Sequence, residues 1–306
     1  MMSSEERLEE ALSAYNSKIS NLEDAGDSDD LLEAYINRGT VLMMMESYVA
    51  AESDFEEAIE TILFRERKGI PTDLGLFIRA YENHGQLFCG NGNDIMVADY
   101  ARIADRLPEL KSGTRYFSLK DIVIMCINCA EDLMDEGYHR EAMPFLTKAS
   151  ESLSGKNDVW SDNRRMDVEG IMGEALKAAG DLKGALDHYE WAVRIGQYLY
   201  DHDEIEDPYL LTLCYMYRGD VKDELGDAKG SLDDHMIACD MLEGSVVNGA
   251  TGNKQMLVDL CQDIASRLME QGNIEKSEKY LLKSMRHGLP EMDEAIGALG
   301  IKRPDE

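Results

Sequence analysis

Apolar side chains recur at the three- and four-residue spacing of amphipathic helices along most of the chain, and short turns interrupt the pattern. In every second helical segment, one small residue holds a fixed place. Several of these residues are glycines, although glycine inside a helix costs about 1 kcal/mol relative to alanine. These small residues, here called anchors, recur every 43 to 46 positions, at Gly39, Gly85, Ala130, Gly173, Gly219 and Ala265. Their recurrence predicts places where one helix closely approaches another.

A second helix follows each anchor, and its inward positions lie 12, 16 and 19 residues further along the chain. In the first copy these positions hold Ala51, Phe55 and Ala58, and the other copies repeat the pattern. The second copy fits least well, through Val97, Ala101 and Ala104. Glycine-containing turns come between the two helices of most copies. Each copy is therefore predicted to be helix, tight turn and helix, which makes the protein all-α.

The repeated pattern resembles the tetratricopeptide repeat (TPR), in which an aromatic residue, a glycine and small or bulky apolar residues hold set places. The first copy matches through Tyr35, Gly39, Ala51, Phe55 and Ala58, and the fifth through Tyr215, Gly219 and Ala238. Arg38 and Arg218 stand where the family has leucine, and the copies exceed the standard 34 residues. Long copies of this kind are similar to those of kinesin light chains and of bacterial peptide-sensing regulators.

The resemblance implies a right-handed α-solenoid of six TPR-like helical hairpins with a capping helix at each end. We expect the N-terminal cap in residues 1–28 and the C-terminal cap and tail in residues 289–306, with its helix over Pro290–Leu299. The six repeats are expected at 29–70, 71–114, 115–158, 159–204, 205–250 and 251–288. Fourteen helices would result, because terminal repeats need atypical elements that cover the end of the stack.

The formal charge of −30 argues against nucleic acid or an anionic membrane as a partner, since both select basic surfaces. The start, MMSSEERLEEALSAY, has no apolar segment of signal-peptide length, and no run of 18 apolar residues occurs. The six cysteines are scattered through helical pattern, which is typical of reduced thiols. From these features we expect a cytoplasmic protein.

The pattern offers no catalytic, metal or cofactor site. Cys126 and Cys129 form half of a zinc motif, but no second cysteine pair follows and both fall on the packing positions. The acidic run Asp201–Asp207 lacks the glycine and the final glutamate of a calcium loop. The six histidines are isolated, so no acid, base and nucleophile come together by spacing. We expect neither an enzyme nor a bound cofactor.

In the resembled family, the first helix of each copy lines the concave groove, and one offset in those helices is distinctive here. Two positions before the anchor stand Asn37, Asn83 and Asn128 in the first three copies. An asparagine amide can pair with both the carbonyl and the N–H of an extended peptide. The resemblance to kinesin light chains implies that such a ladder holds a peptide backbone. The alternative is that three polar residues merely share an exposed face.

Acidic residues dominate the same face, and their charge predicts which charge the ligand carries. They include Glu82, Glu131, Glu174 and Asp220, and Met43 adds a soft, adaptable side chain or simply fills the core. Basic residues that would grip a carboxylate are scarce there, so a neutral or basic peptide is favoured.

The sequence therefore predicts a scaffold that binds such a peptide, or a partner protein, in its concave groove. Two alternatives stay open. One is a peptide-sensing regulator that acts through a separate protein, and the other is a homo-oligomeric scaffold.

Overall fold

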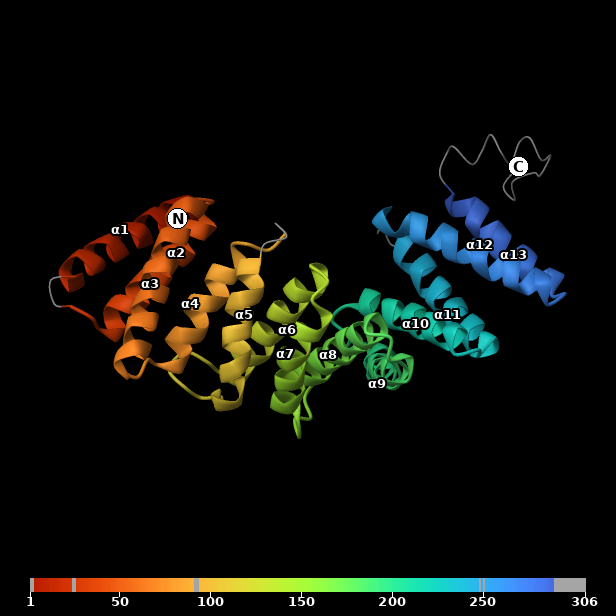
Figure 1. The fold of residues 1–306 in the computed structure, drawn as a ribbon. Helices are drawn as coiled ribbons and strands as arrows, with labels where there is room; N and C mark the ends of the chain where they lie inside the picture. Colours follow the sequence, from red (N-terminus) through yellow and green to blue (C-terminus); the bar gives the residue numbers. More distant parts are fainter. Residues whose placement is uncertain (1–2, 24–25, 91–93, 248, 250, 289–306) are drawn as a thin grey trace. The chain divides into compact units, whose positions relative to one another are not determined.

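The computed structural model describes residues 3–23, 26–90, 94–247, 249 and 251–288 (Figure 1). Thirteen α-helices and two short 3₁₀ segments make up the regular structure of these residues, and none of them lies in a strand. The predicted all-α fold of helical hairpins is confirmed. The expected C-terminal capping helix, Pro290–Leu299, lies outside the described residues.

The chain divides into two compact units, Met1–Ser154 and Gly155–Glu306. Unit 1 begins with the single helix α1 (Ser4–Glu23). Three hairpins follow it: α2 (Asp29–Met44) with α3 (Tyr48–Lys68), α4 (Leu74–Gln86) with α5 (Asp94–Arg106), and α6 (Leu119–Asp135) with α7 (His139–Leu153). The 3₁₀ segment η1 (Leu107–Glu109) follows α5 and packs on both α5 and α7.

Unit 2 also holds three hairpins. They are α8 (Val159–Ala178) with α9 (Leu182–Asp201), α10 (Pro208–Glu224) with α11 (Ala228–Val247), and α12 (Lys254–Glu270) with α13 (Ile274–His287). The segment η2 (Thr251–Asn253) leads into α12. Consecutive hairpins contact one another within this unit, with α9 against α10 and α11 against α12 (Figure 1).

The helices begin where side chains satisfy their first backbone N–H groups. Ser118 and Asp121 form a reciprocal capping box at the start of α6, with bonds of 3.3 and 2.7 Å. Asp207 accepts from the N–H of Tyr209 at 2.9 Å, and Pro208 occupies the first turn of α10. Both starts can be read directly from the sequence, because each cap lies within three residues of its partner.

The anchor glycines lie where the two helices of a hairpin cross. A Cβ placed on Gly39 would come within 2.5 Å of the Phe55 ring, and one on Gly173 within 2.8 Å of Tyr189. Gly219 has the same relation to the imidazole of His235, at 2.5 Å. No real Cβ tolerates such distances, so helix propensity is given up for a close crossing. The prediction made from the recurrence of these glycines is confirmed.

The second copy shows one wrong assignment. Tyr100, not Ala101, fills the space beside Gly85, because a Cβ on Gly85 would lie 2.6 Å from the Tyr100 ring. Tyr100 is buried, whereas Ala101 is exposed. The inward positions of α5 are therefore one residue earlier than the other copies suggest. A one-residue shift in a helix rotates every side chain by about 100°, which explains the weak fit of this copy.

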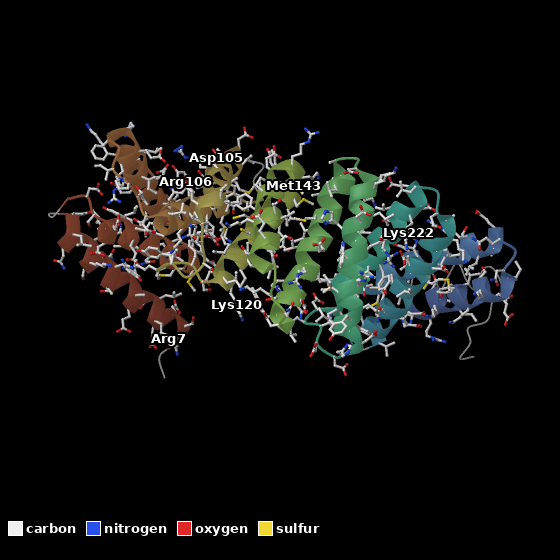
Figure 2. All side chains as sticks on the ribbon, turned by 90° about the horizontal axis from the view of Figure 1, so that it is seen from below. Arg7, Asp105, Arg106, Lys120, Met143 and Lys222 are labelled. Carbon is white, nitrogen blue, oxygen red and sulfur yellow. The ribbon has the colours of Figure 1, made fainter. Side chains whose placement is uncertain are left out.

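The arginines that replace leucine before the anchors bind carboxylates of the same hairpin. Arg38 makes bonds of 2.8 and 2.6 Å to the two oxygens of Asp54, and Arg218 repeats both distances with Asp234. Both aspartates are buried. Lys222, labelled in Figure 2, adds a third bond to Asp234 at 2.8 Å. The arginine that departs from the family pattern is thus accompanied by a buried aspartate on the second helix. The bidentate ion pair between them joins the two helices.

Candidate functional site

The first helix of each hairpin has one side that carries the positions predicted to bind peptide. We call this side the first-helix face. In unit 1 this face belongs to α2, α4 and α6, and in unit 2 to α8, α10 and α12. The predicted residues differ in exposure. Glu131 on α6 and Glu174 on α8 are exposed, whereas Met43, Glu82 and Asp220 are half-buried.

The asparagine row lies in unit 1, and two of its three members bond to neighbouring side chains. Asn37 accepts a hydrogen bond from Arg79 at 2.6 Å, and Asn83 donates to the hydroxyl of Thr40 at 3.1 Å. Both bonds join α2 to α4. Asn128 on α6 is exposed. The role of these amides toward a peptide stays a proposal, with Asn128 the most accessible of the three.

Glu82 contributes less charge to this face than its residue type suggests. Burial raises the pKa of its carboxyl to about 7; Arg79 opposes the shift, and Asp132 adds to it. At neutral pH the group is therefore close to half-protonated. Glu33, an acidic residue of the same face of α2 six positions before Gly39, accepts a hydrogen bond at 2.9 Å from Arg115, which precedes α6. The α2 and α4 part of the unit 1 face is consequently held together by its own side chains.

The first-helix face of unit 2 contains an open hollow of ≈ 540 Å³ between α10 and α12. Asp220 and Met216 line it from α10, and His235 of α11 also lines it. From α12 come the remaining lining residues, Met256, Asp259, Leu260, Asp263 and Arg267. Asp263 holds the position equivalent to the asparagines of unit 1. We call this cavity the acidic hollow.

Three carboxylates, those of Asp220, Asp259 and Asp263, line the acidic hollow together with the guanidinium of Arg267. Arg267 bonds to Asp263 at 2.8 Å along α12, and it also reaches Asp223 of α10 at 3.3 Å. Burial alone would raise the pKa of Asp220, but hydrogen bonds from His235 and Lys177 and their charges lower it below its ordinary value. Asp220 therefore stays ionised, and the hollow keeps a net negative charge.

His235 adds a polar atom that the protein itself leaves unsatisfied. Its Nε2 lies 3.2 Å from both the Met216 carbonyl and an oxygen of Asp220; because both are acceptors, we assign the proton to Nε2. Among the described residues, Nδ1 has no hydrogen-bond partner, and the nearest oxygen of Asp263 is 3.9 Å away. The ring is only 4% exposed. The carboxylates that line the hollow, two of them exposed, are therefore the groups that a ligand can reach, rather than this buried nitrogen.

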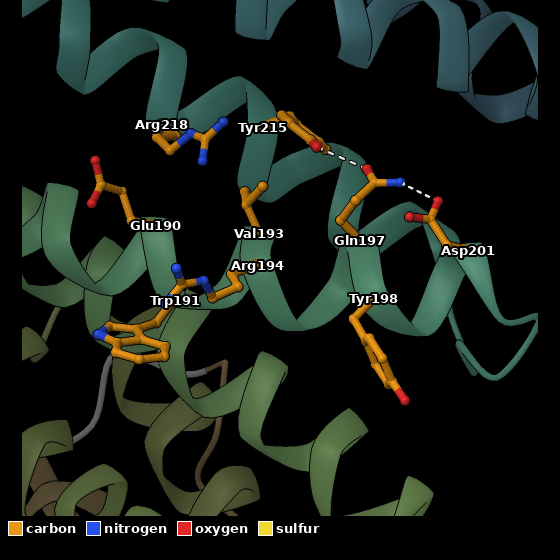
Figure 3. Close-up of a pocket in the computed structure, with 9 residues that line it drawn as sticks. All are labelled: Glu190, Trp191, Val193, Arg194, Gln197, Tyr198, Asp201, Tyr215 and Arg218. Carbon is orange, nitrogen blue, oxygen red and sulfur yellow. Dashed lines mark hydrogen bonds between the residues drawn. The ribbon is translucent and has the colours of Figure 1, made fainter.

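A second hollow, of ≈ 710 Å³, lies along α9 and α10 in unit 2 (Figure 3). Tyr215 donates to Gln197 at 2.8 Å, and Gln197 donates to Asp201 at 2.7 Å. Trp191 and Tyr198 point to the side of α9 away from Tyr215, and each is more than half exposed. The guanidinium of Arg194 stacks 5.2 Å from the centre of the Trp191 ring.

Sequence reasoning missed both His235 and this aromatic pair as candidate residues. His235 stands sixteen residues after Gly219, at the bulky packing position where the repeat predicts a core side chain. Trp191 and Tyr198 are seven residues apart on one helix, at positions that the packing pattern does not use. That spacing is the signal that marks an exposed aromatic stripe.

Cys126 and Cys129 are buried in α6, and burial raises the pKa of both thiols. Within the described part of the chain, no three histidine, cysteine or acidic side chains come close enough together to hold a metal ion. None of the described helices is long and apolar enough to cross a membrane.

Comparisons with solved structures place this fold among known repeat proteins. The C-terminal part of a TPR repeat-containing protein from Cytophaga hutchinsonii superposes with a TM-score of 0.54 at 13% identity, covering 92% of this chain and 94% of that one. BtubC (BKLC) from P. vanneervenii gives 0.50 at 19% identity, over 79% and 92% of the two chains. The apo form of RapI gives 0.50 at 12% identity, over 94% and 87%.

No family model and no curated protein matches the sequence. The likeness to solved structures shows the fold, and the chain is built from TPR-like helical hairpins.

Proposed function

We propose that this protein is an interaction module that binds a neutral or basic peptide, or such a segment of a partner protein, on its first-helix faces. The acidic hollow of unit 2 is the observation that carries the proposal. It is open, and three carboxylates against one guanidinium line it, so it holds a net negative charge.

A lysine ammonium or an arginine guanidinium is the complement of such a hollow, since both are donors without acceptors. Asp259 and Asp263 lie on successive turns of α12, and Asp220 approaches from α10. A cation placed between them would complete the charge balance that Arg267 at Asp263 and Lys177 at Asp220 supply only in part. Electrostatic attraction of this kind speeds association and selects basic ligands.

The asparagine row of unit 1 is the second element of the proposal. The Asn37 oxygen and the Asn83 nitrogen each make one bond to a neighbouring side chain, so both amides have less capacity left for a peptide backbone. Asn128 is exposed and offers both its oxygen and its nitrogen. Backbone contacts there would hold a peptide without reading its sequence, whereas the acidic hollow would select charge.

A random decapeptide library tests this proposal with the intact protein. The selected peptides should be enriched in lysine and arginine, and Asp263→Asn should weaken their binding about tenfold, or 1.4 kcal/mol. Asp233→Asn is the matched control, because Asp233 is an exposed carboxylate of α11 that does not line the hollow.

Enrichment of acidic peptides, or equal losses in the two variants, would overturn the assignment. Light scattering on the same samples addresses the homo-oligomeric alternative. If the protein forms a stable dimer that peptides neither dissociate nor bind, a scaffold that assembles with itself accounts better for the fold.

A further inference from the structure

Two of the six cysteines meet inside unit 2, on helices of different hairpins. Cys239 lies near the middle of α11 and Cys261 in the centre of α12, and both are fully buried. Their sulfur atoms are 3.0 Å apart. A disulfide needs about 2.05 Å, so the two atoms would have to approach by only about 1 Å.

The surroundings of this pair favour a thiolate. The Lys283 side chain is almost fully buried nearby and bonds to Asp240 at 2.5 Å and to Glu243 at 2.6 Å. The hydrogen bond from the Cys239 thiol lowers the pKa of Cys261, and the Lys283 charge adds to this effect, against burial and the charges of Glu243 and Asp240, which raise it. The same hydrogen bond raises the pKa of Cys239. The thiolate is the nucleophile of such a pair, and the neighbouring thiol is in place to react second.

We propose that Cys239 and Cys261 form a modification site at which a hydroperoxide creates a disulfide between α11 and α12. The Cys261 thiolate attacks one peroxide oxygen, the O–O bond breaks, and a sulfenic acid and hydroxide form. Cys239 then attacks the sulfenic sulfur, and its thiol proton leaves with the displaced hydroxyl as water. Overall, two thiols and one hydrogen peroxide give one disulfide and two waters: the sulfurs lose two electrons, which the peroxide oxygens accept.

Burial sets which oxidant can act. A hydrogen peroxide molecule is close to water in size and needs only a small opening to reach the pair. A bulky disulfide such as oxidised glutathione must place its own sulfur in line with Cys261, which the covered position of this thiol opposes. The pair is therefore expected to respond to peroxide faster than to disulfides.

The disulfide would join the fifth hairpin to the sixth beside the acidic hollow. Cys239 lies one turn after His235 on α11, and Cys261 lies between Asp259 and Asp263 on α12. A covalent link there would fix the spacing of the elements that line the hollow. An effect on ligand binding rests on the proposed function, whereas the modification itself does not.

Peptide mapping of the intact, reduced protein tests the site. The protein is treated with hydrogen peroxide and then unfolded, its remaining thiols are alkylated, and the unreduced protein is digested and examined by mass spectrometry. We expect a linked pair of peptides that contain Cys239 and Cys261, two fewer alkylated thiols per chain, and reversal by dithiothreitol. Cys126, Cys129 and Cys214, which are also buried, should stay alkylatable only after unfolding and should stay unlinked.

Two variants give the matched comparison. Cys261→Ala should abolish the linked product and leave Cys239 alkylatable, whereas Cys214→Ala, which removes another buried thiol, should leave the linkage unchanged. Three outcomes would overturn the proposal: six alkylated thiols after peroxide, linkage of other cysteines, or conversion of Cys261 to sulfinic acid without a linked partner. Peptide binding measured before and after oxidation then tests the proposed function separately.

Discussion

The first-helix faces of the first two hairpins and the last two hairpins differ, although both are built on the same anchors. In unit 1, α2 and α4 are in contact, and the Asn37–Arg79 and Asn83–Thr40 bonds close the face between them. In unit 2, α10 and α12 leave the acidic hollow open, with Asp263 at the position of the asparagines. Equivalent positions thus bond to the neighbouring first helix in one region, whereas in the other Asp263 bonds along its own helix and lines an open hollow.

The contrast teaches that a repeat position has no fixed role. Internal hairpin packing is the same in both regions, since Arg38–Asp54 and Arg218–Asp234 share their geometry. What differs is the separation of successive first helices. Where successive first helices are in contact, their polar side chains bond to each other. Where the two helices are separated, the space between them leaves room for a ligand.

The largest expected effect comes from breaking the arginine–aspartate ion pair that the two regions share. Asp234→Ala leaves two buried or half-buried cations, Arg218 and Lys222, without their carboxylate, and should cost about 3–5 kcal/mol of unfolding free energy. Asp54→Ala leaves only Arg38, which is also more exposed, and should cost less. Urea denaturation of both variants provides the comparison. Equal costs would show that Lys222 contributes nothing to the pair.

The next effect concerns the anchors. Gly39→Ala should destabilise the protein by about 1–3 kcal/mol, because the new methyl group overlaps the buried Phe55 ring. Gly244→Ala, within α11 and with open space around it, should instead stabilise by about 0.5–1 kcal/mol. Thermal unfolding measures both. A neutral Gly39→Ala would mean that the crossing relaxes and that close packing does not explain the anchors.

The anchor of the fifth copy should behave differently from that of the first. Gly219→Ala displaces the His235 ring, which lines the acidic hollow, so peptide affinity should fall together with stability.

The sequence predicted the helices, caps and anchors because these depend on residues within about four positions of one another or on an exact repeat. Copy two was misassigned by one residue, since nothing local fixes the phase of α5 against Gly85. The partners of Arg38 and Arg218 are 16 residues away on another helix. Whether Asn83 meets Thr40 or solvent depends on the separation of α2 and α4, which no local pattern encodes.

A pH dependence distinguishes the two faces. Because burial raises the folded pKa of Glu82 to about 7, the folded state holds a proton that the unfolded state has released above its ordinary value of 4.5. Unfolding free energy should therefore fall as pH rises from about 4.5 to 7, by roughly 1–3 kcal/mol from this group. Glu82→Gln should flatten that part of the profile. An unchanged slope in the variant would assign the dependence to other groups.

The smallest expected effects belong to the asparagine row. Asn83→Ala should cost about 1 kcal/mol of stability, since it removes the bond to Thr40, whereas Asn128→Ala should leave stability unchanged. If the row holds a peptide backbone, the order reverses for binding, with Asn128→Ala weakening affinity most. Unfolding curves and binding curves on the same samples rank the two variants by stability and by peptide affinity. Equal binding by both variants and the wild type would make the row a coincidence of spacing.

Titration calorimetry with a library-selected basic peptide tests the central claim most directly, namely that charge recognition belongs to the acidic hollow of unit 2. The double variant Asp259→Asn/Asp263→Asn is compared with Glu33→Gln/Glu131→Gln, which removes two charges from the unit 1 face. We predict that the unit 2 variant binds at least tenfold more weakly and loses most of its salt dependence, while the unit 1 variant stays within about twofold. The reverse order, or equal affinity in both variants and the wild type, would contradict the account and direct attention to the Trp191 and Tyr198 surface of α9.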